Sequence, residues 1–182
     1  GIADSFKVQA AKSKLEIVDE ETFKDDSATS FTNQLTKAKQ AGATMIFAPI
    51  YYTPASVLLK NAKDMGYDVK MMGCDGMDGI LTMEGFDPKL AEGVMLLTPF
   101  NADATDEKTA SFVKKYKEQF GETPNQFAAD AYDCVYAYKQ ALENAGATPD
   151  MSAEDLCDKM IEQFTSMTFD GLTGEGMTWD ET

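Results

Sequence analysis

Residues 44–79 read TMIFAPIYYTPASVLLKNAKDMGYDVKMMGCDGMDG and contain one complete strand–helix–strand unit. Residues 44–49 form a short apolar run that is typical of a buried parallel strand. Residues 56–65 carry apolar side chains at helical spacing, and Gly66 stands where a helix is expected to end. Residues 69–72 are predicted to be the next strand. Two strands joined through a helix run in the same direction, so the unit predicts a parallel sheet.

Both predicted strands end in loops that carry aromatic or acidic side chains. Tyr51 and Tyr52 follow the first strand, and Asp75 and Asp78 follow the second. In an open parallel sheet, ligands bind in the crevice beyond the carboxyl ends of the strands. These residues are therefore candidates for holding a small ligand. A structural role remains open for each, because tyrosines also pack at strand ends and aspartates often cap helices or turns.

Composition narrows the classes of partner. The chain has 182 residues, of which 43% are hydrophobic, enough for a real core. No apolar run approaches the roughly 18 residues of a membrane span. The 31 acidic and 16 basic residues give a net charge of −15. Nucleic acid and anionic lipid both require a cationic surface, so neither is an expected partner.

The sequence contains neither histidine nor arginine. Nucleophile activation by histidine, the common histidine-containing zinc sites and bidentate arginine clamps are therefore excluded. Cys74, Cys134 and Cys157 are far apart and odd in number, which does not indicate a disulfide framework. A metal-dependent enzyme using Asp75 and Asp78 is the weaker alternative, since their spacing matches no common metal-site pattern. We expect no enzyme, no metal and no cofactor.

Residues 1–100 alternate predicted helices and strands, which indicates a parallel sheet with helices on its faces. Besides the central unit, the expected elements are a helix over residues 1–14, a strand over 15–18, a helix over 31–41 capped by Ser30, a short helix over 80–83 and a strand over 94–98. The chain opens inside a helix without a signal sequence or initiator methionine, so we expect it to be part of a longer protein.

Residues 101–182 follow a different pattern, so we expect a boundary near residue 100. The predicted elements are helices over residues 107–120, 125–144 and 153–164, and a hairpin-like segment over 169–179. The charge changes too: residues 1–100 carry 14 acids and 10 bases (net −4), whereas residues 101–182 carry 17 acids and 6 bases (net −11). The acidic helices are expected to present a solvated face.

Six sequence blocks occur in an order and spacing that together are specific. They are GIADSFK, SFTNQLTKAKQAGATMIFAPIYYTPASVLLKNAKDMGYDV, MGCDGMDG, AEGVMLLTPF, FVKKYKEQFGETPNQFAADAYDCVYAYKQALENAG and FDGLTGEGMTWDET. In these blocks the sequence resembles the type I periplasmic binding protein family, and within it the branched-chain amino acid (Leu/Ile/Val-type) substrate-binding proteins of ABC importers.

The resemblance implies a fold and a function. Residues 1–100 would be the second, Rossmann-like lobe without its first strand. Residues 101–182 would be the helical segment and hairpin that belong to the first lobe. The protein would be a non-catalytic, extracytoplasmic solute-binding protein, in the periplasm or lipid-anchored at the cell surface. It would capture a branched-chain or other apolar amino acid between two lobes and deliver it to the permease of an ABC importer.

The resemblance also implies roles for individual residues. Tyr51 matches an aromatic that lines the amino acid site, with Tyr52 beside it. Asp75 matches the acidic residue of a G-x-[DE]-G loop that pairs with the ligand's α-ammonium, although Asp is shorter than the Glu often found there. Phe127 matches an aromatic near the ligand side chain. Asp78 remains a further candidate from its place in the loop.

Two further expectations follow. One alternative function on the same fold is the ligand-sensing domain of a receptor or transcription regulator. The resemblance also implies that half of the site is missing from these 182 residues. We therefore expect weak amino acid binding by this chain alone, and self-association through unpaired apolar surfaces.

Overall fold

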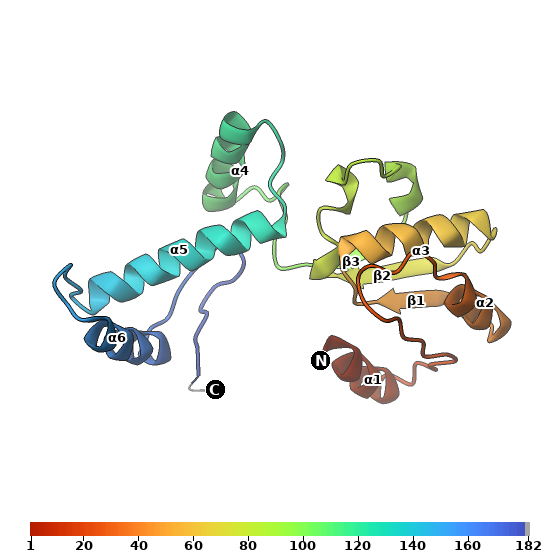
Figure 1. The fold of residues 1–182 in the computed structure, drawn as a ribbon, viewed down its shortest axis with the longest axis horizontal. Coiled ribbons are helices and arrows are strands. Elements are labelled where there is room, and N and C mark those ends of the chain that lie inside the picture. Colours follow the sequence, from red (N-terminus) through yellow and green to blue (C-terminus); the bar gives the residue numbers. More distant parts are fainter. Residues whose placement is uncertain (181–182) are drawn as a thin grey trace. The chain divides into compact units, whose positions relative to one another are not determined.

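The computed structural model describes residues 1–180 and divides the chain into two compact units, Gly1–Thr98 (unit 1) and Pro99–Thr182 (unit 2) (Figure 1). Unit 1 contains a parallel sheet with helices, and unit 2 contains three helices followed by an extended segment. The fold is therefore α/β, as the alternating pattern of the first hundred residues predicts.

The sheet of unit 1 has three strands in the order β1-β2-β3, and both pairs are parallel. The strands are β1 (Met45–Ala48), β2 (Lys70–Cys74) and β3 (Met95–Leu97). Met45 lies opposite Lys70, and Met72 lies opposite Met95. Helix α3 (Tyr52–Asp64) connects β1 to β2, which confirms the predicted strand–helix–strand unit.

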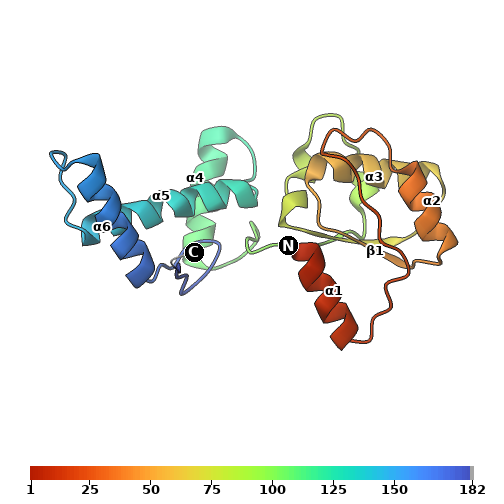
Figure 2. The same ribbon diagram turned by 60° about the horizontal axis from the view of Figure 1, so that its bottom comes forward.

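Side chains of β1 alternate between the two faces of the sheet. Ile46 and Ala48 belong to the core that contains α3 and α2 (Thr32–Gln40). Phe47 faces the other way and stacks on Phe6 of α1 (Ile2–Lys12), with ring centroids 4.1 Å apart. Figure 2 shows α3 and α1 on opposite sides of the sheet. The period of two along a strand thus decides which helix covers which face.

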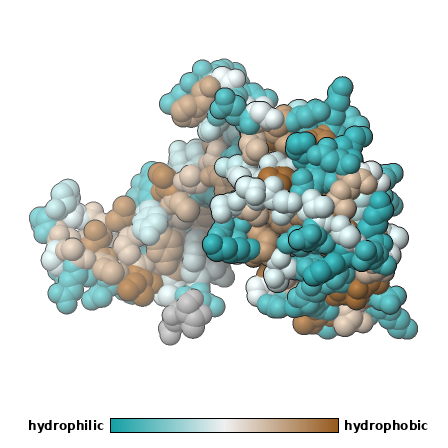
Figure 3. Space-filling model, turned by 45° about the vertical axis from the view of Figure 1, so that its right-hand side comes forward, coloured by the Kyte–Doolittle hydropathy of each residue, from teal (hydrophilic) through white to brown (hydrophobic). Residues whose placement is uncertain are grey.

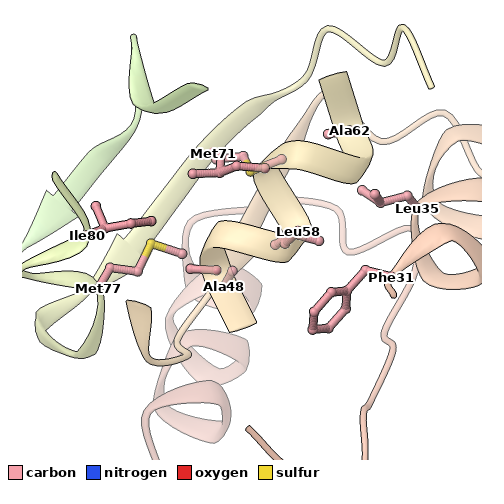
Figure 4. Close-up of a cluster of buried hydrophobic side chains, with 10 residues drawn as sticks. Phe31, Leu35, Ala48, Leu58, Ala62, Met71, Met77 and Ile80 are labelled. Atoms are coloured by element: carbon pink, nitrogen blue, oxygen red, sulfur yellow. The ribbon is translucent and has the colours of Figure 1, made fainter. Parts of the chain in front are cut away.

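The core of unit 1 lies between the sheet, α2 and α3. Leu35, which is 1% exposed, and Met77, which is fully buried, lie at opposite ends of the cluster (Figure 4). Gly73 leaves room for Met77, because a Cβ at position 73 would lie 2.2 Å from the Met77 sulfur. A larger residue at position 73 would therefore displace the Met77 side chain from its present position.

The prediction of a strand over residues 15–18 is wrong. This segment is irregular in the structure, and Leu15, Ile17 and Val18 are exposed. A strand needs a neighbour to satisfy its backbone groups. In the described part of the chain β1 pairs with β2 alone, and residues 15–18 pair with no strand.

The start of α2 also differs from the expectation. Phe31, not Ser30, occupies the N-cap position. Ser30 Oγ accepts a hydrogen bond from the Thr32 amide at 3.3 Å, and the Phe31 amide donates to Asn61 Oδ1 of α3 at 2.8 Å. A side chain of the neighbouring helix thus satisfies one free amide at this helix start.

The helices of unit 2 lie where they are predicted. They are α4 (Glu107–Phe120), α5 (Gln126–Asn144) and α6 (Ala153–Ser166). Asp106, Asn125 and Ser152 cap them by accepting hydrogen bonds from backbone amides. An antiparallel bridge between Phe169 and Met177 confirms the hairpin-like segment. None of the described helices is both long and apolar enough to span a membrane.

Apolar residues also reach the surface, as one view of the space-filling structure shows (Figure 3). On α5 the exposed apolar side chains include Val135, Tyr138 and Leu142, which line a shallow groove with Cys134. Self-association through such surfaces stays a prediction.

Replacing Leu35 by alanine should strongly destabilise unit 1. A buried Leu→Ala change costs about 2–5 kcal/mol because it removes apolar contacts and leaves a cavity. The matched control is Leu81→Ala, since Leu81 is 60% exposed and its loss should change the free energy of unfolding by less than about 0.5 kcal/mol. Urea unfolding followed by circular dichroism measures both. Equal effects would contradict the packing described here.

Candidate ligand-binding site

The loop after β1 places two tyrosines in different environments. Tyr51 is the N-cap residue of α3, has an extended backbone and is 55% exposed. Tyr52 is the first residue of the helix and packs against the core of unit 1. The ring of Tyr51 is therefore available to a ligand, whereas Tyr52 serves packing at the strand end.

The loop after β2 holds both candidate aspartates. Asp75 begins the 3-10 turn Asp75–Met77, which the buried side chain of Met77 anchors in the core. Asp78 follows the turn, and its Oδ1 accepts a hydrogen bond from the Gly79 amide at 2.9 Å. Both aspartates are half-buried. Asp78 thus has the local turn role that is common for aspartate.

The Asp75 carboxylate has a different environment. Within residues 1–180, no side chain or amide donates a hydrogen bond to this carboxylate and no lysine pairs with it. A half-buried charge without a partner carries an energetic cost that a cationic group on a ligand would offset. Asp75 therefore stays a candidate for receiving an ammonium group.

Gly76 brings the two loops together. A Cβ built at position 76 would lie 3.1 Å from the carbonyl oxygen of Ile50 and 3.2 Å from Cδ1 of Tyr51. The backbone beside Asp75 therefore lies against the ring of Tyr51, at the carboxyl edge of the sheet. Sequence analysis identified the loops but missed this contact. Its signal is the glycine between Asp75 and Met77, whose lack of a side chain permits the close approach.

Cys74 lies directly before Asp75 and is buried. Burial raises the pKa of the Cys74 thiol, and the negative charge of Asp75 raises it further. The thiol is thus held in its neutral form, unlike the thiolate that a nucleophile or a metal ligand requires. Among the residues that the structure describes, no group of three or more histidine, cysteine, aspartate or glutamate side chains could hold a metal ion.

Phe127 lies in unit 2, in the first turn of α5, and is 37% exposed. Asn125 starts this helix by accepting a hydrogen bond from the Ala128 amide at 3.1 Å. The structure therefore brings Tyr51, Tyr52, Asp75 and Asp78 to one edge of unit 1, and it describes Phe127 as part of a separate unit.

The sequence model of the periplasmic binding protein family matches residues 1–182. The chain belongs to this family. Its members are periplasmic or extracellular binding proteins, a class that is typically not enzymatic. The parallel sheet and its helices correspond to about half of the length of the type I periplasmic binding protein structures to which the chain is similar.

Three relatives show how far the similarity extends. The leucine-, isoleucine-, valine-, threonine- and alanine-binding protein of Pseudomonas aeruginosa is 28% identical over 145 residues, which is 79% of this chain and 36% of that protein. The branched-chain amino acid transporter substrate-binding protein LivJ of Streptococcus pneumoniae, solved in complex with isoleucine, is 26% identical. Its match has a TM-score of 0.74 and covers 96% of this chain and 48% of LivJ.

An extracellular ligand-binding receptor from Rhodopseudomonas palustris has the same fold. Its TM-score is 0.85 at 23% identity, and the match covers 98% of this chain and 52% of the receptor. The chain thus spans about a third of the length of the P. aeruginosa protein and about half the length of these two solved structures.

We expect Gly76→Ala to destabilise unit 1 through the contact with Tyr51. The added methyl group is crowded by the ring and the Ile50 carbonyl, and overpacking of this kind costs about 1–3 kcal/mol. In a double-mutant cycle with Tyr51→Ala, removal of the ring should recover part of that loss, giving a coupling energy of about 0.5 kcal/mol or more. Strictly additive changes in the free energy of unfolding would show that the ring does not crowd position 76.

Alkylation of the three thiols should report the charge of Asp75. Because the pKa of Cys74 is raised, a smaller fraction is thiolate at a given pH, and iodoacetamide should modify Cys74 more slowly than the exposed Cys134 and Cys157. The change Asp75→Asn removes the negative charge, which is one of the two causes of the raised Cys74 pKa. The pH midpoint of Cys74 alkylation should therefore fall while that of Cys157 stays constant. An unchanged Cys74 midpoint would argue against close proximity of the two groups.

Proposed function

We propose that this chain carries one half of an amino acid site in an extracytoplasmic solute-binding protein of an ABC importer. The observation that carries the proposal is the half-buried, unpaired carboxylate of Asp75, which follows β2 and directly precedes Gly76, whose backbone lies against the exposed ring of Tyr51. An anion in one loop and an exposed aromatic ring in the neighbouring loop suit a ligand that has a cationic group and an apolar side chain.

In the proposed complex the α-ammonium group of the ligand pairs with Asp75. Tyr51 covers the apolar side chain of the ligand, and Tyr52 holds Tyr51 in place by packing in the core. Asp78 keeps the loop in shape through the Gly79 amide. We also propose Phe127, which lies in unit 2, as a ligand contact, on the family resemblance alone. The donors for the ligand carboxylate lie outside these 182 residues, in the lobe that the family resemblance implies.

Relatives support the class of ligand. The P. aeruginosa protein is named for binding leucine, isoleucine, valine, threonine and alanine, and the S. pneumoniae protein was solved with isoleucine. All of these ligands share the ammonium group that Asp75 would receive, and most have an apolar side chain. A branched-chain or other apolar amino acid is the ligand that we propose here.

Delivery to the importer follows from the same model. Closure of two lobes over the ligand buries it, and opening at the permease releases it. The proposed partners are accordingly the amino acid and the permease subunits, and the proposed location is the periplasm or the outer cell surface. Capture and release need no covalent chemistry, and we propose that the protein is not an enzyme.

Calorimetric titration of the full-length protein with leucine, isoleucine and valine tests the proposal. Asp75→Ala should weaken binding about 10- to 100-fold, because a hydrogen bond to a charged group contributes about 1.5–3 kcal/mol. Asp68→Ala is the matched control, since Asp68 precedes β2 and lies at its opposite end. This control should bind normally.

Two results would contradict parts of the proposal. Unchanged affinity in Asp75→Ala would remove the ammonium site while leaving the family assignment intact. No binding of any apolar amino acid by the unmodified protein would instead indicate a ligand without an ammonium group or a sensing role.

A further inference from the structure

A segment of unit 2 that the ligand site does not use returns along α5. It comprises residues 167–180, here called the strap, and follows directly after α6 (Figures 1 and 2). Phe169 and Met177 exchange two backbone hydrogen bonds of 2.9 Å each, and the Gly171 amide donates to the Gly174 carbonyl at 2.8 Å. The strap is therefore a narrow, internally bonded loop.

One buried carboxylate of α5 binds the tip of this loop. Asp133 is 5% exposed. Its Oδ1 accepts a hydrogen bond from the Leu172 amide, and its Oδ2 accepts from the amide and the hydroxyl of Thr173, all at 2.8 Å. None of the ion pairs in the described part of the chain involves Asp133. The strap thus supplies the donors that compensate this buried charge.

The surface around Asp133 is built for close approach of a backbone. Ala129, Asp133, Ala137 and Ala141 recur every four residues and lie on one face of α5, where all four are buried. Gly171 of the strap lies directly against this face, and its lack of a side chain is what permits the approach: a Cβ there would lie 2.3 Å from Asp133 Oδ2. The small residues permit a close approach of the strap, and the one carboxylate among them bonds its tip.

The strap also joins two separate apolar clusters. Leu172 packs in the cluster of Phe100, Phe112 and Ala129. Met167 and Phe169 pack in the cluster of Ala137 and Ala141, which lies further along α5. Asp133 lies between the two clusters on the helix. Its three hydrogen bonds therefore hold the piece of chain that links them.

We propose that Asp133 is a latch that sets the register of the strap on α5, and that the strap leaves α5 as one cooperative unit when the latch is broken. Helix α5 keeps its own backbone hydrogen bonds and stays folded. The remaining polar and ring contacts of the strap are Gln140 Nε2 to the Thr168 carbonyl at 2.9 Å, Lys108 Nζ to the Asp170 carbonyl, and the edge of Trp179 against Phe164. In the proposal, these contacts and the apolar packing of Met167, Phe169 and Leu172 do not hold the strap without the latch.

Amide hydrogen exchange of the 182-residue chain, followed by NMR, tests the latch in Asp133→Ala. The decisive amides are those of Phe169 and Met177, which bond to each other and not to Asp133. They should lose protection together with Leu172 and Thr173, by on the order of tenfold or more, while α5 amides keep theirs. Fluorescence of Trp179, the single tryptophan, should shift to longer wavelength.

The matched control is Asp130→Ala, on the same helix and half-buried, whose carboxylate accepts from Gln126 Nε2 at 3.2 Å. It should leave the strap protected. Two further variants decide the matter if Asp133→Ala does not fold. Gly171→Ala keeps the carboxylate but crowds it, and Thr173→Val removes one of the three donors. Both variants should reduce amide protection across the strap while α5 stays protected, and Thr173→Val should have the smaller effect.

Either of two results would overturn the proposal. Loss of protection confined to Leu172 and Thr173 would show that Asp133 makes local bonds without controlling the strap. Equal loss across the strap and α5 would show that the two do not separate.

Discussion

Parallel pairing of β1 with β2 is the constraint on which unit 1 depends. Because the strands run in the same direction, their carboxyl ends meet at one edge, and the loops that carry Tyr51 and Asp75 become neighbours although 24 positions separate them in the sequence. The same pairing decides the faces of the sheet. Ile46 and Ala48 point to α3, and Phe47 points to α1. Core and candidate site therefore follow from one register.

Much of this arrangement could be predicted from the sequence, because the signals are local. The apolar run before Tyr51 and the helical spacing after it indicate the central unit, and Asp106, Asn125 and Ser152 mark the starts of the three helices of unit 2. Capping and periodicity act within a few residues, so one sequence is sufficient to detect them. The wrong prediction of a strand at residues 15–18 shows what local sequence signals cannot predict. Its apolar residues favour a strand locally, but a strand also requires a partner, which no local pattern reports.

The contacts that sequence reasoning missed are those between distant segments. The glycine at position 76 permits a close approach, but nothing near it in the sequence identifies Tyr51 as the neighbour, and nothing near Asp133 indicates that the strap supplies its donors. Asp133 is one of 17 acids in residues 101–182, and its neighbours suggest an ordinary solvated helix face. The role of a helix face with three alanines and one aspartate can be recognised only when the glycine and the amides that lie against it are known. Burial of a charge depends on partners that are remote in sequence.

Three aspartates illustrate how different environments give the same side chain different roles. Asp133 is buried and fully bonded by one segment of its own chain, so its charge contributes to structure. Asp78 bonds the next amide along the chain and shapes a turn. Asp75 is half-buried like Asp78, yet no donor in residues 1–180 bonds it, and the ring of Tyr51 lies beside its loop. Retaining an uncompensated carboxylate in a partly apolar setting costs stability unless a cation arrives. That cost is the physical reason for proposing a role in ligand recognition for Asp75, whereas the hydrogen bonds of Asp78 and Asp133 serve structure.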